Sequence, residues 1–185
     1  DDPGHPLNAV FGGRGWEFRD EFFRVHEPYG RQRVRVLFSI DTEKTDLKQG
    51  RGAGQLERAD DDYALAWIRS YGRGRTFYCT IAHNPYVFWD ARMLRFYLGA
   101  IQFALGDLAA PTTPSAWLTP AVRAQERLGW RLGVEAYTFH KATFFDTVDR
   151  AAKLGLPYVG GLSFQKLSAQ IPKNFEPGLS DDELR

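Results

Sequence analysis

One short segment, residues 107–115, constrains the fold of this chain more than any other feature. It holds two prolines and no periodic hydrophobic pattern, which is typical of a linker. The sequence before it predicts strands and one long helix, and the sequence after it predicts a strand–helix–strand unit. We therefore expect an α/β protein with a first domain over residues 1–106, a linker over residues 107–127 and a second domain over residues 128–185.

Two strands are expected in the first domain. Residues 34–40 are apolar at every second position, which predicts a strand with one buried face. Residues 75–81 are β-branched and aromatic, which suits a buried strand. Residues 64–70 fit either a short helical turn or a strand edge, and the charged, glycine-rich residues 44–62 predict an exposed loop.

The strongest helix signal follows these strands. Asp90 is the expected N-cap, the helix runs to about Leu105, and Gly106 stands where a helix commonly ends. One side of this helix is expected to be apolar, with Met93, Leu94, Tyr97, Leu98, Ile101 and Leu105 on it.

The second domain reads as a single βαβ unit. Residues 132–139 predict a strand, Thr143 caps a helix over residues 144–154, and residues 156–161 predict a second, parallel strand. Because one such unit cannot bury both faces of its sheet, we expect it to open a larger α/β fold. Ser180 and Glu183 form a capping box before a single helical turn, so we expect the chain to continue in a longer polypeptide. The alternative is a short terminal turn with a frayed end.

Charge and composition exclude several functions. The 185 residues carry a net charge of +1 with acidic and basic residues interleaved, so we expect neither nucleic-acid nor anionic-membrane binding. No apolar run is long enough to span a bilayer, and one cysteine makes neither an internal disulfide nor a Cys-based zinc cluster. The compartment stays open between cytoplasm and periplasm.

The first domain resembles the C-terminal half of the ThuA-like family of trehalose utilisation. The resemblance is carried by six stretches: residues 2–7, 18–23, 34–37, 71–78, 82–85 and 98–106. It implies the fold of the class I glutamine amidotransferases, here a partial flavodoxin-like doubly wound sheet, and a bacterial protein of carbohydrate metabolism.

The second domain resembles the start of the sugar phosphate isomerase/epimerase family, the xylose isomerase-like TIM barrels. Residues 132–139 and 144–156 correspond to the first strand and helix of such a barrel. Gly160 and Gly161 stand where these barrels usually carry a carboxylate, and the family's metal ligands would lie beyond Arg185. We therefore expect no cofactor within these residues, and a divalent metal would belong to the full-length barrel.

His83 and Glu21 are the candidate catalytic residues. His83 directly follows the strand predicted over residues 75–81, and a neutral imidazole there can act as a base. In class I amidotransferases a His-Pro-Glu motif at this place supplies the base of a Cys-His-Glu triad, whereas residues 83–86 read His-Asn-Pro-Tyr and lack the acid. The alternative for His83 is a structural role at a strand end.

Glu21 and Asp20 stand among Trp16, Phe18, Phe22 and Phe23. A carboxylate against apolar surface suits general acid or base work, and the alternative for Glu21 is a solvated edge carboxylate. Cys79 lies inside the predicted strand, where we expect it to pack in the core.

Five further residues are candidate contacts for a substrate. Aromatic faces stack against sugars and polar side chains fix their hydroxyl groups, which selects Asn84, Trp67, Trp89, Tyr137 and His140. For Trp89 the alternative is packing of the helix against the sheet. No pair of histidines has metal-ligand spacing, so no metal site is expected within the chain.

The two resemblances thus imply part of a bacterial carbohydrate-metabolism protein that isomerises or epimerises sugars or keto-sugars, or processes oxidised disaccharides. The alternative is a non-catalytic carbohydrate-binding or scaffold module. A homo-oligomer is compatible with either function.

Overall fold

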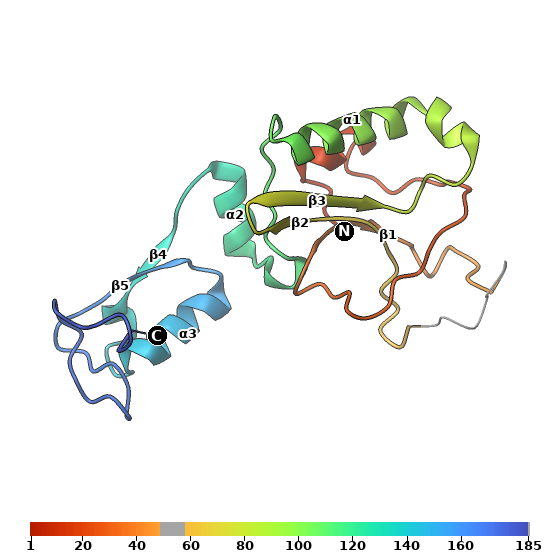
Figure 1. Cartoon of the computed structure of the whole chain (residues 1–185). Coiled ribbons are helices and arrows are strands. Elements are labelled where there is room, and N and C mark those ends of the chain that lie inside the picture. The colour runs from red at the N-terminus through yellow and green to blue at the C-terminus, as the bar shows by residue number, and fades with distance from the viewer. Residues whose placement is uncertain (49–57, 185) are drawn as a thin grey trace. The chain divides into compact units, whose positions relative to one another are not determined.

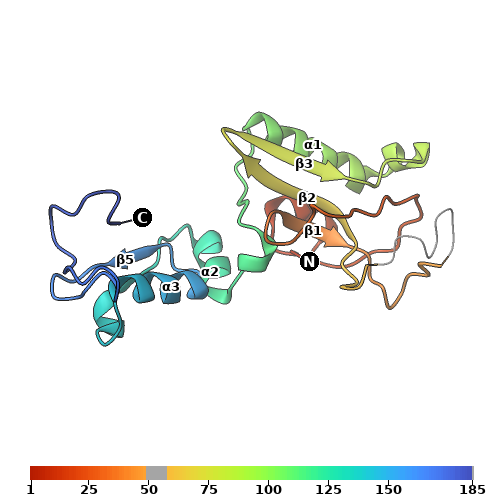
Figure 2. The same cartoon turned by 60° about the horizontal axis from the view of Figure 1, so that its bottom comes forward.

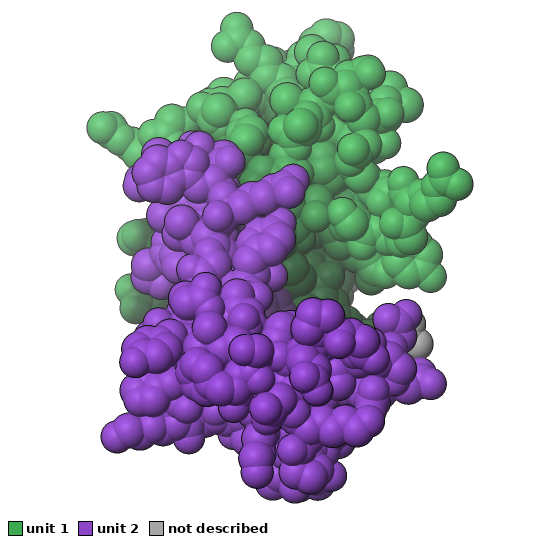
Figure 3. Space-filling view, turned by 90° about the vertical axis from the view of Figure 1, so that its left-hand side faces the viewer, with its two compact units in different colours: residues 1–116 green, residues 117–185 purple. Residues whose placement is uncertain are grey.

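The computed structural model describes residues 1–48 and 58–184 and divides the chain into two compact units, Asp1–Ala116 and Trp117–Arg185 (Figure 1). Figure 3 colours the two units separately, and each unit has a sheet of its own. The division falls inside the segment expected to be a linker, although its last residues begin helix α2 (Pro120–Leu128). The middle of the loop expected over residues 44–62 lies outside the described residues.

Unit 1 is built on an antiparallel sheet in the order β1 (Arg35–Ser39), β2 (Ala64–Tyr71) and β3 (Gly74–Cys79). Only Gly72 and Arg73 join β2 to β3, and so short a loop can connect only antiparallel strands. Gly72 has a φ of +56°, a conformation that a tight hairpin turn requires and glycine adopts without strain. The parallel order of a doubly wound sheet is therefore not what these residues form.

The burial of the strands also differs from the expectation. The segment over residues 64–70, expected as a helical turn or a strand edge, is the central strand. β1 is buried on both faces rather than one, and β3 is an exposed to half-buried edge rather than a buried strand. Within the described residues, other segments of the chain hydrogen-bond to the outer edge of β1, whereas β3 pairs only with β2.

Three contacts cover the outer edge of β1. The carbonyl oxygen of Leu37 accepts hydrogen bonds from the Asp2 amide at 3.3 Å and from Asn8 Nδ2 at 2.8 Å. The Val36 amide donates to Ser115 Oγ at 2.8 Å. The N-terminal segment and the segment after the long helix thus satisfy backbone groups that a further strand would otherwise pair.

Helix α1 (Ala91–Leu105) begins and ends as the sequence predicts. The Asp90 carboxylate accepts hydrogen bonds from the Arg92 and Met93 amides, and Gly106 ends the helix with a φ of +99°. Figures 1 and 2 show this helix lying over one face of the sheet.

The prediction of which side of α1 is buried is mostly wrong. The side chains that enter the core are Met93, Phe96, Ala100 and Phe103, whereas Leu94, Leu98, Ile101 and Leu105 are exposed. The helix carries two apolar stripes, and the core takes the one with the two phenylalanines. Phe96 is fully buried and its ring packs with those of Phe11, Phe38 and Phe77 at centroid distances of 5.2 to 5.4 Å.

Replacing the N-cap Asp90 by alanine should lower the free energy of unfolding by about 1 kcal/mol. The Arg92 side chain, followed by the Met93 and Arg92 amides, holds the pKa of Asp90 at about 2. A depressed folded-state pKa stabilises fully above the usual carboxyl pKa of about 4, and that stabilisation is lost as the pH falls towards 2. Urea titrations should therefore separate wild type from Asp90→Ala at pH 7 and much less at pH 2. An equal difference at both pH values would contradict this role.

Unit 2 contains the expected βαβ unit. Strand β4 (Gly133–Glu135) pairs in parallel with β5 (Tyr158–Gly160), and helix α3 (Phe144–Leu154) lies between them in the sequence. Thr143 and Asp146 form a full capping box, and Gly155 ends the helix with a φ of +72°. Only three residues of each strand pair, so the strand expected over residues 132–139 is too long, and Ala136–Phe139 forms a 3-10 helix instead.

The C-terminal capping contacts are present without the expected helix. The Ser180 amide donates to Glu183 Oε2 at 2.9 Å, and Ser180 Oγ lies 3.0 Å from the same oxygen, but residues 181–183 form a turn. Across the described part of the chain, no helix has both the length and the apolar character needed to cross a membrane.

Candidate functional site

The two candidate catalytic side chains meet, although they lie far apart in the sequence. His83 Nε2 lies 3.3 Å from Glu21 Oε2, and the side chains are 52% and 58% exposed. A carboxylate at this distance favours the tautomer with the proton on Nε2, which leaves the lone pair of Nδ1 free to take a proton.

Asp20 fixes the backbone on which His83 stands. Its carboxylate accepts hydrogen bonds from the His83 amide at 3.2 Å, the Asn84 amide at 3.0 Å and Asn84 Nδ2 at 2.6 Å. The Phe23 amide donates to Thr80 Oγ1 at 2.7 Å. The segment around Glu21 is thereby tied to the segment that follows β3.

Residues 16–24 are extended, and burial alternates along them. The even-numbered residues are half-buried and the odd-numbered ones are exposed. Trp16, Phe18 and Phe22 pack against the core of unit 1. This alternation leaves Glu21 on the exposed side, where it reaches His83.

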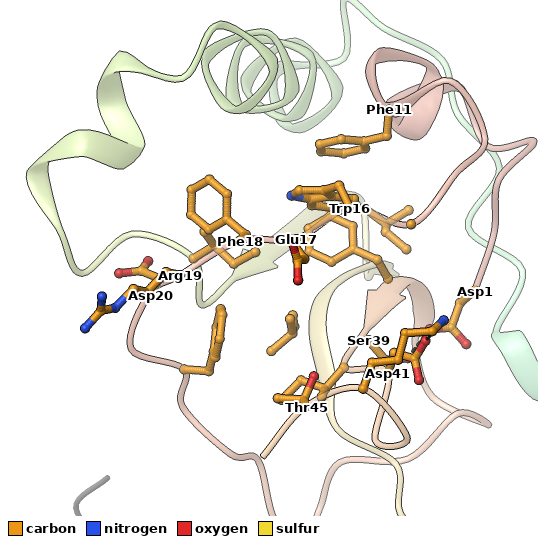
Figure 4. A pocket seen from close by; sticks show the side chains of 18 of the residues that line it. Asp1, Phe11, Trp16, Glu17, Phe18, Arg19, Asp20, Ser39, Asp41 and Thr45 are labelled. Carbon is orange, nitrogen blue, oxygen red and sulfur yellow. Dashed lines mark hydrogen bonds and ion pairs between the residues drawn. The ribbon is translucent and has the colours of Figure 1, made fainter. Parts of the chain in front are cut away.

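A large open groove lies beside this pair. It has a volume of about 1780 Å³, and Glu21 and Asp20 line it, whereas His83 lies outside its lining. Figure 4 shows Phe11, Trp16 and Phe18 along one wall, with Ser39, Asp41 and Thr45 across from them. Phe11 and Trp16 are stacked at a centroid distance of 4.0 Å. The groove therefore offers an aromatic wall opposite a polar one.

A second, smaller hollow adjoins the pair. It has a volume of about 430 Å³ and is lined by Arg19, Asp20, Asn84 and Tyr86. The Tyr86 hydroxyl donates a hydrogen bond to the Arg19 carbonyl oxygen. Asp20 lines both hollows, so the smaller one continues the site rather than forming a separate one.

The family described as ThuA: Trehalose utilisation matches residues 1–104. The chain belongs to the ThuA family. The match covers more than half of the chain and lies entirely within unit 1, and it indicates a carbohydrate-related role. No curated protein and no solved structure matches the chain. The match does not extend into unit 2, so the resemblance of residues 132–156 to isomerase/epimerase barrels stays a prediction.

The ThuA unit lacks the conditions for a cysteine nucleophile. Burial raises the pKa of Cys79, and the Tyr97 hydroxyl lies 3.7 Å from its sulfur. A raised pKa keeps the thiol protonated at neutral pH, and the thiolate is the reactive form. Glu21 places a carboxylate beside His83, but with a buried, protonated Cys79 these residues do not complete an amidotransferase triad.

Of the remaining candidate contacts of the ThuA unit, Asn84 lines the smaller hollow, whereas Trp67 and Trp89 line neither hollow. Trp67 pairs in register with Val36 and Tyr78, and its ring stacks on Tyr78 at 5.0 Å. Trp67 does not line the groove. Trp89 is 83% exposed, so it does not pack the helix against the sheet, and it also lies outside the groove lining.

The two candidates in unit 2 form a small aromatic pair of their own. The rings of Tyr137 and His140 stack at a centroid distance of 5.1 Å, and His140 Nδ1 lies 3.0 Å from the Tyr137 carbonyl oxygen. Among the residues that the structure describes, no three histidine, cysteine or acidic side chains gather as metal ligands would.

Sequence reasoning missed most of the groove. Phe11 comes from a short 3-10 helix (Pro6–Phe11), and Ser39 and Asp41 stand at the end of β1. A signal was present for the latter two, because polar residues directly after an apolar strand are common in binding sites. Nothing in the sequence indicated Phe11.

Proposed function

We propose that unit 1 binds a carbohydrate that carries a keto group and moves a proton at the carbon next to that carbonyl. The observation that supports this is the 3.3 Å contact between His83 Nε2 and Glu21 Oε2, because Glu21 also lines the aromatic-walled groove. The aromatic wall stacks against C–H faces of a sugar, and Ser39, Asp41 and Thr45 hydrogen-bond its hydroxyl groups.

The chemistry follows from the orientation of the imidazole. Nδ1 of His83 takes the proton from the hydroxyl-bearing carbon next to the carbonyl. The electron pair of that C–H bond forms the C=C bond of an enediolate, and the carbonyl oxygen takes the negative charge. Glu21 accepts the hydrogen bond from Nε2–H and stabilises the imidazolium. Return of the proton to the former carbonyl carbon, with transfer of the adjacent hydroxyl proton to the former carbonyl oxygen, gives an isomer. Return of a proton to the opposite face of the first carbon gives an epimer. No redox partner is consumed in either case.

The second candidate function is a carbohydrate-binding module without turnover. It is favoured by the exposure of both His83 and Glu21, since a proton carrier works best where water is excluded.

Solvent exchange distinguishes the two functions. The full chain is incubated in D₂O with a ketohexose or a keto-disaccharide, and proton NMR follows the signal of the hydrogen next to the carbonyl. We expect that signal to decay faster than in buffer, while saturation-transfer difference NMR reports binding. The corresponding sugar alcohol is the matched control, because it can bind but has no exchangeable C–H.

The outcomes are separable. Binding with exchange supports proton transfer, and binding without exchange supports the module. If neither binding nor exchange is detected with any keto-sugar, the proposal is wrong.

A further inference from the structure

The outer face of α1 carries an apolar surface that is exposed in the described structure. It consists of four side chains, each between 47% and 73% exposed, which we call the outer stripe: Leu94, Leu98, Ile101 and Leu105. The core-facing side chains of α1 lie on the opposite side of the helix. Contiguous large apolar side chains on a protein surface mark an interaction site.

The spacing of the outer stripe fits another helix. Its members are separated by four, three and four residues, the spacing with which two helices interlock along a seam. A partner must present a matching row, and α1 of a second copy of the chain does so. A two-fold axis would place each stripe on its counterpart and leave no apolar row unmatched.

Charges beside the stripe favour an antiparallel arrangement. Arg95 flanks its first half, and Asp107 follows its end. Within the described residues, no ion pair joins either side chain to a partner. Antiparallel packing brings Arg95 of each copy towards Asp107 of the other and opposes the two helix dipoles, whereas parallel packing would bring like charges together.

We propose that the outer stripe is a homodimer interface in which α1 packs antiparallel against α1 of a second copy. The stripe extends over about 17 Å of helix. A seam of that length buries less surface area than the roughly 1,200–2,000 Å² of a standard interface. The dimer is therefore reversible, with a dissociation constant in the micromolar range. Its formation does not depend on the proposed sugar chemistry.

Sedimentation velocity of the full chain tests the proposal. Between about 1 and 300 µM the mass should rise from 21.1 kDa towards twice that value. Leu98→Glu should stay monomeric throughout, because a carboxylate cannot be buried in an apolar seam. The matched control is Leu128→Glu, an exposed leucine of unit 2, which should dimerise like wild type. Circular dichroism establishes that both variants are folded.

Charge reversal tests the orientation. Arg95→Glu alone or Asp107→Arg alone should weaken the dimer about tenfold, because each places like charges at both ends of the seam. The double variant should recover most of the affinity. A double variant weaker than either single one would overturn the antiparallel arrangement. A wild-type chain that stays at 21.1 kDa at every concentration would overturn the dimer and leave the stripe to a different partner.

Discussion

Replacing His83 by alanine should slow deuterium exchange into a keto-sugar at least a hundredfold. General acid–base catalysis by a positioned side chain contributes typically about 10²–10⁴-fold, and His83 is the proton carrier in the proposed reaction. Its side chain is half exposed and supports no core packing, so the variant should fold normally. Saturation-transfer signals from the bound sugar should persist, because the aromatic wall is unchanged.

Two further variants show whether the loss of deuterium exchange is specific to the contact between His83 and Glu21. Glu21→Gln keeps a hydrogen-bond acceptor beside Nε2 but removes the negative charge, and we expect a smaller loss of about tenfold. His26→Ala is the matched control, since this histidine is also exposed but makes no ion pair with Glu21 in the described structure. If His83→Ala and His26→Ala exchange deuterium at the same rate, His83 is not the base.

Replacing Phe96 by alanine should cost about 3–5 kcal/mol of the stability of unit 1. Phe96 is fully buried between α1 and the sheet, and three other rings contact it. The truncation removes apolar burial and leaves a cavity that these rings can fill only in part. Because the ring is central to the core, little of the loss can be recovered by local collapse.

Hydrogen exchange of the β2 amides measures this loss. These amides belong to the central strand and exchange by opening of the unit, so their exchange should accelerate more than a hundredfold in Phe96→Ala. Leu105→Ala is the control on the same helix, because that side chain is 73% exposed and should change exchange less than fivefold. Equal acceleration in the two variants would show that Phe96 is not central to the core.

Local sequence signals predicted the elements of the fold well. Asp90 and Gly106 bound α1, and Thr143 and Gly155 bound α3, because caps and left-handed glycines act on their own immediate backbone. The order and direction of the strands could not be predicted with the same means. The short loop of Gly72 and Arg73 did indicate that β2 and β3 are antiparallel, but the family resemblance predicted a parallel sheet.

The buried face of α1 shows a different limit. Both of its apolar stripes have helical spacing, so periodicity alone cannot tell which one enters the core. The choice depends on the shape of the space above β2 and β3, which is filled by Phe96 and Phe103. That shape is set by residues distant in the sequence.

The sequence selected residues of the candidate site but did not predict that His83 and Glu21 would be in contact. His83 and Glu21 were selected for separate reasons, and no sequence pattern joins positions so far apart. Asp20 holds the backbone of His83, because its carboxylate accepts hydrogen bonds from the amides of His83 and Asn84. Trp67 satisfied the same sequence criteria, yet it stacks with Tyr78 away from the groove.

The two edges of the unit 1 sheet differ in how they resist aggregation. At β1 the chain's own Asp2, Asn8 and Ser115 occupy the backbone groups that a foreign strand would seek. Within the described residues β3 pairs only with β2; Arg75 stands in its exposed first half and Arg73 in the loop before it. Cationic side chains on an open edge disfavour strand addition by another molecule. Neutralising these two arginines should therefore make strand addition at this edge easier.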